Sequence, residues 1–486
     1  MLQTAVFPSG DATLAQPALT RTAAQSLTEQ LAERFAARIR DRLLAPGARL
    51  PSVRQCAAQH GLNPSTVVAA YDLLLAQGMV EARRNRGFFV RERAPLRGET
   101  VSVSTAPAVT PGMAAPISAA MLIRGMFHTT GGKPQPGMGV FPPEWLASTF
   151  MAAAVRKVSG SKALADSSLR YGEPQGDGHL RRVLASRLQG MGLPAEASQI
   201  ITTVGATHAL DIVSRTLLKP GDCVMVEEPG WAVEFARLDA MGMRILPVPR
   251  GPLGPDLAVM ARYCEVHAPK LFVSVSVLHN PTGHCLSPAS AHRVLQLAQR
   301  HDFHIVEDDT YSHIAPEHAT RMSVLDGLQR SIYVSGFAKI LAPNWRVGFL
   351  VAPPDLTERL LDTKLLATLT TPSLLERAMA LCIESGQLRR HAERIRTRLD
   401  AARTRSVKLA QAAGCRFVAE PSGLFGWVDT GVDTEALAQR LLDEGYLIAP
   451  GALFHAARAP STLMRINFAT TQDAAFWKVF RRLAGR

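Results

Sequence analysis

The stretch Ser335–Gly348, SGFAKILAPNWRVG, decides how the rest of this sequence is interpreted. Lys339 follows small residues, and Arg346 lies seven positions later in a largely apolar setting. A lysine amine can form a Schiff base with an aldehyde, and the rigid fork of arginine suits a phosphate. The chain has nine lysines, and most lysines are solvated surface charges. Lys339 therefore gains its meaning only from the motifs around it.

Length and composition predict more than one domain. The chain has 486 residues, 47% of them hydrophobic. A chain of this length usually folds around more than one hydrophobic core. It has no run of 18 apolar residues, and its first residues lack the pattern of a signal peptide, so we expect neither a membrane span nor secretion. The six scattered cysteines show no metal-ligand spacing. We expect a cytoplasmic protein with free thiols and no metal site.

Positive charge is concentrated near the N-terminus. The chain has a formal net charge of +13, and the segment Arg21–Arg97 holds 13 arginines against six acidic residues, a net +7. An arginine-rich module of this kind is typical of binding to a phosphate backbone, although a solvated basic surface would look the same by charge alone.

The same segment predicts two short helices joined by a turn. An amphipathic helix is expected over 25–44, because apolar residues recur there every four positions. Ser52 can cap the next helix and Gly61 can end it. Asn63 is a good N-cap for a third helix, and Pro64 suits its first position. Two short helices separated by a glycine-containing turn are the helix-turn-helix arrangement.

Residues 81–90, EARRNRGFFV, predict a hairpin with a basic tip. Together with RLPSVR at 49–54 and STV at 65–67, this hairpin makes the segment resemble the winged helix-turn-helix of the GntR transcription regulators. The resemblance implies that the helix over 63–76 enters the major groove of double-stranded DNA. The residues expected to contact DNA are Arg49, Arg54, Asn63, Ser65, Thr66, Arg84 and Arg86. Pro64 stands where the family often has arginine, which leaves the base contacts open.

Beyond a Pro-, Ala-, Ser- and Thr-rich segment at 94–117, motifs alternate with helical stretches in the manner of an α/β domain. Six motifs accompany the Lys339 stretch: YGEPQG at 171–176, TTVGATHAL at 202–210, VEEPGW at 226–231, LHNPTG at 278–283, VEDDTY at 306–311 and LMRINFA at 463–469. In this order they resemble a fold-type I aminotransferase. With the N-terminal module, nearly the whole chain resembles the MocR-type branch of the GntR regulators.

The resemblance implies pyridoxal 5'-phosphate (PLP) as the cofactor and assigns contacts to its ring. Lys339 would form the aldimine and also move protons in any reaction. Asp308 would pair with the protonated pyridine nitrogen, which keeps the ring an electron sink. Asn280 and Tyr311 would bond the phenolate oxygen, although the family often has tyrosine one position earlier. Trp231 would stack on the ring.

The cofactor's phosphate and the substrate have their own expected contacts. The strand-to-helix turn after Val204 presents free N–H groups to a phosphate, through Ala206 and Thr207. The other expected phosphate contacts are Arg346, Ser335 and, across a homodimer, Tyr171. Gly336 and Ala338 depart from the family, which usually has Ser or Thr at the first position and often Ser at the second, so Ser335 would have to substitute. Arg465 is expected to hold an amino acid's α-carboxylate.

These observations predict a multi-domain protein. We expect a tail over 1–24, a winged helix-turn-helix over 25–93, a linker over 94–117 and a fold-type I α/β domain over 118–486, with a smaller α/β subdomain from about 370. The leading hypothesis is a PLP-dependent transcription regulator that senses PLP or an amino compound through aldimine chemistry at Lys339, and acts as a homodimer. One alternative is an active aminotransferase with a DNA-binding module, and another is a regulator whose second domain only dimerises.

Overall fold

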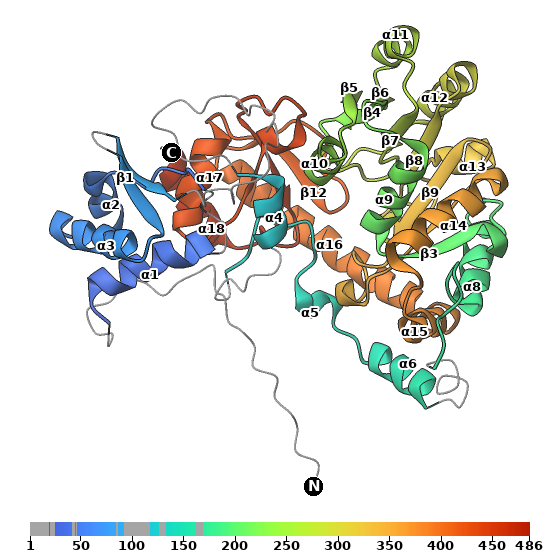
Figure 1. Ribbon diagram of the computed structural model, residues 1–486, viewed down its shortest axis with the longest axis horizontal. Coiled ribbons are helices and arrows are strands. Elements are labelled where there is room, and N and C mark those ends of the chain that lie inside the picture. The colour runs from blue at the N-terminus through green and yellow to red at the C-terminus, as the bar shows by residue number, and fades with distance from the viewer. Residues whose placement is uncertain are drawn as a thin grey trace, which may run out of the picture. The chain divides into compact units, whose positions relative to one another are not determined.

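A computed structural model describes residues 19, 25–40, 44, 46–83, 86–91, 117–125, 133–160 and 169–486 of the chain. It has two compact units (Figure 1). The first comprises Met1–Met138 with Asp433–Ala449, and the second comprises Gly139–Val432 with Pro450–Arg486. Apart from Leu19 and Ile117, the predicted tail and linker lie outside the described residues.

The N-terminal helices begin and end where local chemistry directs. After α1 (Leu27–Arg40), helix α2 (Val53–His60) is capped by Ser52, whose hydroxyl accepts from the Gln55 backbone N–H. Gly61 ends α2 with φ 63°, a conformation that glycine adopts at little cost. Asn63 caps α3 (Pro64–Ala76), with proline at its first position. The structure confirms these predicted caps.

A two-stranded wing completes this module. Strands β1 (Val80–Arg83) and β2 (Gly87–Val90) pair antiparallel, as predicted. Their buried ends pack into one core with side chains of α1, α2 and α3, including Phe35 and Tyr71. The winged helix-turn-helix therefore has its own hydrophobic core. The first unit also holds α4 (Ala119–Gly125) and α17 (Thr434–Asp443).

The second unit is built on a large mixed sheet. Its strands are β3 (Ile200–Val204), β4 (Cys223–Glu228), β5 (Arg244–Gly251), β6 (Gly254–Pro255), β7 (Leu271–Ser274), β8 (His304–Asp308), β9 (Ser331–Gly336) and β10 (Val347–Val351). They lie in the order β3-β10-β9-β8-β7-β4-β5-β6. β5, β4, β7, β8 and β9 run parallel, whereas β10 is antiparallel to both of its neighbours.

Helices cover both faces of this sheet. The helices that pack on it are α9 (Ala206–Leu217), α10 (Ala232–Ala240), α11 (Leu257–His267), α12 (Pro288–His301), α13 (Met322–Asp326) and α14 (Pro354–Thr368). Val224 and Val226 of β4 belong to a core that includes side chains of α9, α10 and α14. Met225, between them, belongs to a separate core with side chains of α11, α12 and α13. This alternation is the period of two expected of a strand buried on both faces.

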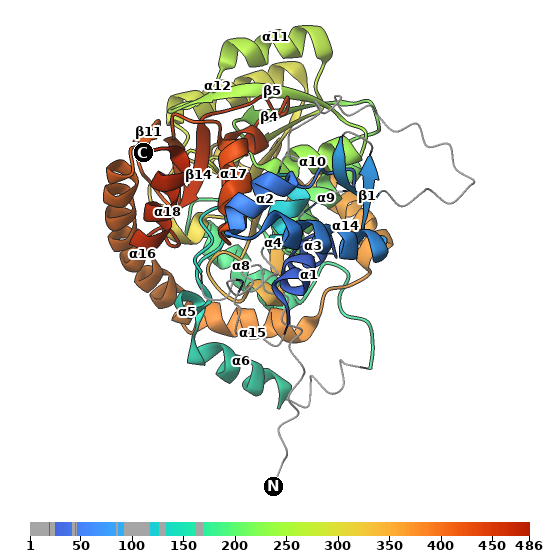
Figure 2. The ribbon, with the colours of Figure 1, turned by 90° about the vertical axis from the view of Figure 1, so that its left-hand side faces the viewer.

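The remaining elements of the unit flank the sheet or form a smaller sheet. They are α5 (Pro143–Leu146), α6 (Thr149–Ser159), α8 (Gly178–Gln189), α15 (Ser373–Glu384), α16 (Gln387–Ala412), β11 (Arg416–Phe417), β12 (Phe425–Asp429), β14 (Leu463–Asn467) and α18 (Ala474–Ala484), with the short β13 (Ala449–Pro450) at the division between the units. β12 pairs antiparallel with β11 and with β14. Figure 2 shows α16 as a long curved helix.

The sheet brings the predicted motifs to one edge. β3 and β9 are both antiparallel to β10, so β3 runs in the same direction as β9. The carboxyl ends of β3, β4, β7, β8 and β9 therefore lie at the same edge, where ligands of open α/β sheets bind. The residues at or after these ends are Ala206, Trp231, Asn280, Asp308 and Lys339. No helix among the described ranges is long and apolar enough to cross a membrane.

Candidate functional site

The first candidate site is the exposed start of α3. The Asn63 side-chain oxygen accepts hydrogen bonds from the Ser65 backbone N–H (3.1 Å) and from the Ser65 hydroxyl (2.9 Å). Ser65 is exposed and Thr66 is half-buried. The cap uses the Asn63 side-chain oxygen, and Asn63 itself is exposed, as are Val68 and Ala69 further along the helix. Apolar side chains of this kind suit a thymine methyl group, and the motif analysis had not singled them out.

Basic side chains flank this helix. Arg54 is exposed on α2, and Arg86 is exposed at the wing. Arg49 forms a β-bridge with Phe89, and its guanidinium lies against Gly87 of the wing. Arg83, which the motif analysis did not select, lies over the Phe89 ring at 4.6 Å. Arg84 lies outside the described residues.

The second candidate site centres on Lys339. Lys339 is half-buried, and its amine donates to the Gly139 carbonyl oxygen (2.8 Å). Burial, with the nearby positive charge of Arg465, lowers the pKa of Lys339 from 10.5 to about 8. A lysine with a lowered pKa is neutral, and so nucleophilic, in a larger fraction near neutral pH.

Glycines shape the part of the site beside Arg346. The Arg346 Nη2 donates to the Val204 carbonyl oxygen (3.1 Å), at the turn that opens α9. A Cβ on Gly205 would lie 2.4 Å from that Nη2, and one on Gly348 would lie 2.5 Å from the Gly205 carbonyl carbon. Arg346 itself has φ 52°, a conformation that non-glycine residues rarely adopt and that often marks functional sites. The turn, the helix start and the arginine together form an anion cradle that side chains on these glycines would obstruct.

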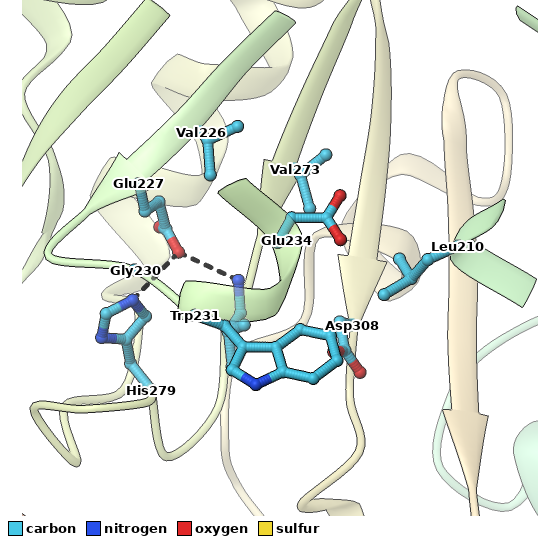
Figure 3. A pocket seen from close by; sticks show the side chains of 10 residues that line it. Leu210, Val226, Glu227, Gly230, Trp231, Glu234, Val273, His279 and Asp308 are labelled. Carbon is cyan, nitrogen blue, oxygen red and sulfur yellow. Dashed lines mark hydrogen bonds and ion pairs between the residues drawn. The ribbon is translucent and has the colours of Figure 1, made fainter. Parts of the chain in front are cut away.

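A small hollow is lined by Trp231, Glu234, His279 and Asp308 (Figure 3). Burial raises the pKa of Asp308 to about 6, against hydrogen bonds from the Thr310 hydroxyl and backbone N–H. A cation beside this carboxylate would hold it ionised. The arrangement suits a flat, protonated heteroaromatic ring next to an indole.

Arg465 meets Asn280 and Tyr311 in one buried group. Arg465 Nη1 donates to Asn280 Oδ1 (2.9 Å), and Asn280 also shares a hydrogen bond with the Tyr311 hydroxyl. The guanidinium lies over the Phe425 ring at 4.4 Å and over the Phe454 ring at 5.1 Å. Burial lowers its pKa to about 10, so the group is still charged at neutral pH. Burial raises the pKa of the Tyr311 phenol, which stays neutral.

A buried charge network supports the loop that carries Asn280, and the motif analysis missed it. Glu227 forms an ion pair with Arg250 and accepts from the Ser274 hydroxyl (3.0 Å) and the Val275 N–H (2.9 Å). His279 Nε2 lies 3.6 Å from Glu227, as Figure 3 shows, and burial lowers the pKa of this histidine well below its ordinary value. Glu227 therefore ties β4 to the loop after β7. In the sequence, only the position of Glu227 directly before Glu228-Pro229-Gly230 could have indicated this role.

Two predicted residues are not joined to this group by a contact within the described chain. The Ser335 hydroxyl is buried and donates to the Asp309 carbonyl oxygen (2.9 Å). This hydrogen bond joins β9 to the end of β8. Tyr171 is 82% exposed. Gly139, which the motif analysis overlooked, contributes the carbonyl that holds the Lys339 amine.

The two units define the class of the protein: a winged helix-turn-helix joined to a fold-type I domain. The aminotransferase class I and II model matches residues 146–483, and the model of the gntR family of bacterial regulatory proteins matches residues 27–90. The chain belongs to the aminotransferase class I and II family and, with its gntR-type N-terminal domain, has the MocR-type architecture. The cofactor of this family is PLP, and the Lys339 amine, the anion cradle, the Trp231 indole and the Asp308 carboxylate described above fit it.

Relatives carry both halves of this architecture or only the second. The chain is 25% identical over 434 residues to the uncharacterised HTH-type transcriptional regulator YdfD of Bacillus subtilis, covering 87% of this chain and 88% of that protein. It is 27% identical over 368 residues to the 2-aminoadipate transaminase of Thermus thermophilus, covering 74% and 89%. The multiple substrate aminotransferase structure from Thermococcus profundus superposes with a TM-score of 0.67 at 26% identity, covering 73% and 91%.

Proposed function

We propose that this protein is a PLP-dependent transcription regulator that binds double-stranded DNA through its first unit and senses an amino compound at Lys339. The observation that carries the proposal is the half-buried Lys339 amine, with its lowered pKa, in a chain that also has an anion cradle and a capped helix α3. When bound, the cofactor supplies an aldehyde that reacts reversibly with amines. Such a regulator acts in the cytoplasm, where the DNA is.

The site residues divide the work of recognition. Lys339 would hold the cofactor covalently, and an incoming amine would compete with it. Arg346 and the N–H groups at the start of α9 would bind the phosphate, and Asp308 would keep a proton on the ring nitrogen. Trp231 would cover the ring, while Asn280 and Tyr311 would bond its oxygen. Arg465 binds the α-carboxylate of an amino acid, which selects amino acids over simple amines.

A homodimer is part of the proposal. Tyr171 is 82% exposed, although an aromatic residue of this size usually buries most of its surface. In a dimer it would reach the phosphate at the partner's site. Two copies of the first unit would then present two recognition helices to two half-sites of an operator.

The proposal is tested by measuring DNA affinity and turnover on the same sample. An amino acid that changes the absorbance of the loaded protein should change its affinity for the promoter region of its own gene severalfold. This corresponds to a coupling energy of about 1–3 kcal/mol. Keto-acid production should stay far below the enzyme median of about 10 per second. Steady turnover at enzyme-like rates, with DNA affinity indifferent to the same amino acid, would favour the aminotransferase alternative.

Two substitutions in the first unit should separate phosphate contacts from base contacts. Arg54→Ala removes an exposed charge, so it should weaken binding to all duplexes and lower the salt slope by about one unit. Ser65→Ala removes a hydroxyl at the start of α3, so it should change sequence preference and leave the salt slope unaltered. Competition between promoter DNA and random duplex at several salt concentrations measures both effects. Equal behaviour of the two variants would contradict the assignment of α3.

A further inference from the structure

Helix α16 carries far more positive charge for its length than the rest of the chain does. Eight of its 26 residues are basic and two are acidic, a net +6, whereas the whole chain has 54 basic residues in 486. The segment Arg21–Arg97 carries +7, so these two segments together account for the net +13. Nothing in the PLP site or the winged helix-turn-helix uses the charge on α16.

The basic residues of α16 are sorted around the helix. At about 100° per residue, five of them fall within a sector of about 80°. We call this the α16 stripe: Arg390, Arg394, Arg398, Arg405 and Lys408. All five are exposed, and within the described parts of the chain none of them forms an ion pair with a carboxylate. The two acids of the helix, Glu393 and Asp400, pair instead with Arg389 and Arg403 on its flank.

The stripe is not needed to hold α16 in place. The helix packs through a separate face, whose buried residues include Leu388, Ile395 and Leu399. A membrane-surface helix would need its apolar face free for lipid, and in α16 that face is buried in protein. The stripe therefore suits a hydrophilic polyanion.

All four guanidinium groups of the stripe are held in position. Arg390 Nη2 donates to the Ser385 carbonyl oxygen (3.0 Å), and Arg405 Nε donates to the Gln472 carbonyl oxygen (3.1 Å). Arg398 lies over the Trp145 ring at 4.4 Å, and Arg394 Nη2 lies 2.7 Å from His391 Nδ1. An arginine stacked on an aromatic ring keeps its planar fork of N–H donors free for a phosphate, at a smaller entropic cost than a mobile side chain. Figure 2 shows the whole length of α16 along the outside of the second unit.

We propose that the α16 stripe is a second, sequence-independent contact for duplex DNA, through which the aminotransferase-like unit binds the phosphate backbone beside the operator. From Arg390 to Lys408 the stripe extends about 27 Å at 1.5 Å per residue. That length matches about eight base pairs at 3.4 Å per pair. The proposal rests on the proposed function, because the first unit is what brings DNA to the molecule.

The test compares full-length variants on a short duplex of about 15 base pairs and a long one of about 60, both of random sequence. Neutralising three stripe residues, in R394Q/R398Q/R405Q, should lower the salt slope on the long duplex by up to about three units, since each phosphate contact contributes about 0.9. Binding to the short duplex should be unchanged. The matched control R389Q/R396Q/R403Q removes the same charge from the flank of the same helix and should leave the slope on the long duplex nearly as it is.

Two other outcomes of these measurements would overturn the proposal. Equal losses in the stripe and control variants would show general electrostatic attraction and overturn the proposal. An altered oligomeric state in light scattering, with unchanged salt slopes, would make the stripe a subunit interface and also overturn it. R394K/R398K/R405K keeps the charge and should retain most of the slope, which guards against loss by misfolding. Failure of the proposed function would appear separately, as binding to the short duplex that is indifferent to Arg54→Ala.

Discussion

Replacing Lys339 by alanine should remove the covalently held cofactor and, with it, the response of DNA affinity to amino compounds. Lys339 is half-buried at the carboxyl edge of the sheet, and its amine donates to the Gly139 carbonyl oxygen. The wild-type protein should absorb visible light after purification with PLP, whereas Lys339→Ala should lose that absorbance on dialysis. A wild type that stays colourless with excess PLP would contradict the assignment.

Lys364 provides a matched control for this substitution. It is a buried lysine whose pKa burial also lowers to about 8, and it donates to the Pro174 carbonyl oxygen, not to Gly139. Lys364→Met should therefore keep the colour, even where it lowers the free energy of unfolding. If both lysine variants lose the cofactor equally, the loss reports unfolding and not the removal of an attachment point.

The pH dependence of loading gives a second readout of the same assignment. Only the neutral amine attacks an aldehyde, and burial lowers the pKa of Lys339 to about 8. The loading rate of the cofactor-free protein should therefore rise with pH and level off just above pH 8. For an ordinary lysine it would continue to rise towards 10.5. Stopped-flow absorbance measures this rate directly.

Local patterns were enough to predict the winged helix-turn-helix. The helix caps at Ser52 and Asn63 and the turn at Gly61 depend on residues at most four positions apart, so their chemistry can be interpreted without knowing the fold. The same holds for the motifs at the carboxyl ends of strands, because each sits on a single strand-to-loop junction. The parallel sheet then brings those junctions to one edge. The placement of Asp433–Ala449 in the first unit has no such local signal.

The parts of the site that sequence reasoning missed depend on contacts between distant segments. The ion pair of Glu227 with Arg250 spans 23 positions, and the bond from Lys339 to Gly139 spans 200. Neither has a periodic signal. The expected role of Ser335 at the phosphate stays a prediction. Its position beside Gly336 makes it the available hydroxyl, and in the fold that hydroxyl donates to the Asp309 carbonyl oxygen.

The α16 stripe could be counted in the sequence but not interpreted there. A helix with many arginines can bury one face and expose another in several ways, and only the packed structure shows which residues remain exposed. Both acids and their partners Arg389 and Arg403 lie outside the stripe sector, on the flank of the helix. The proposed DNA contact is therefore supported by where the charged residues lie around the helix, more than by the total charge of the helix.

Replacing Arg465 by methionine should abolish the selection of amino acids while leaving the cofactor bound. Its guanidinium is enclosed by Phe425 and Phe454 and donates to Asn280, so it presents a charged fork in a site that excludes water. Truncating one partner of a buried charge pair typically costs about 2–4 kcal/mol, roughly a 30- to 1,000-fold loss in affinity. Methionine is unbranched and apolar, so it can occupy the space between the two rings without leaving a cavity.

The measurement uses a pair of ligands that differ only in the carboxylate. An amino acid that changes the absorbance of the wild type should need roughly 30- to 1,000-fold higher concentration with Arg465→Met, whereas the matching amine without the α-carboxylate should act equally on both proteins. Equal loss of both ligands would show damage to the cofactor site, and loss of neither would assign the carboxylate contact to another residue. In a sensor, the operator response should follow the absorbance change in every combination of ligand and variant. Absorbance that changes without any effect on DNA binding would leave Arg465 as a substrate contact of an enzyme.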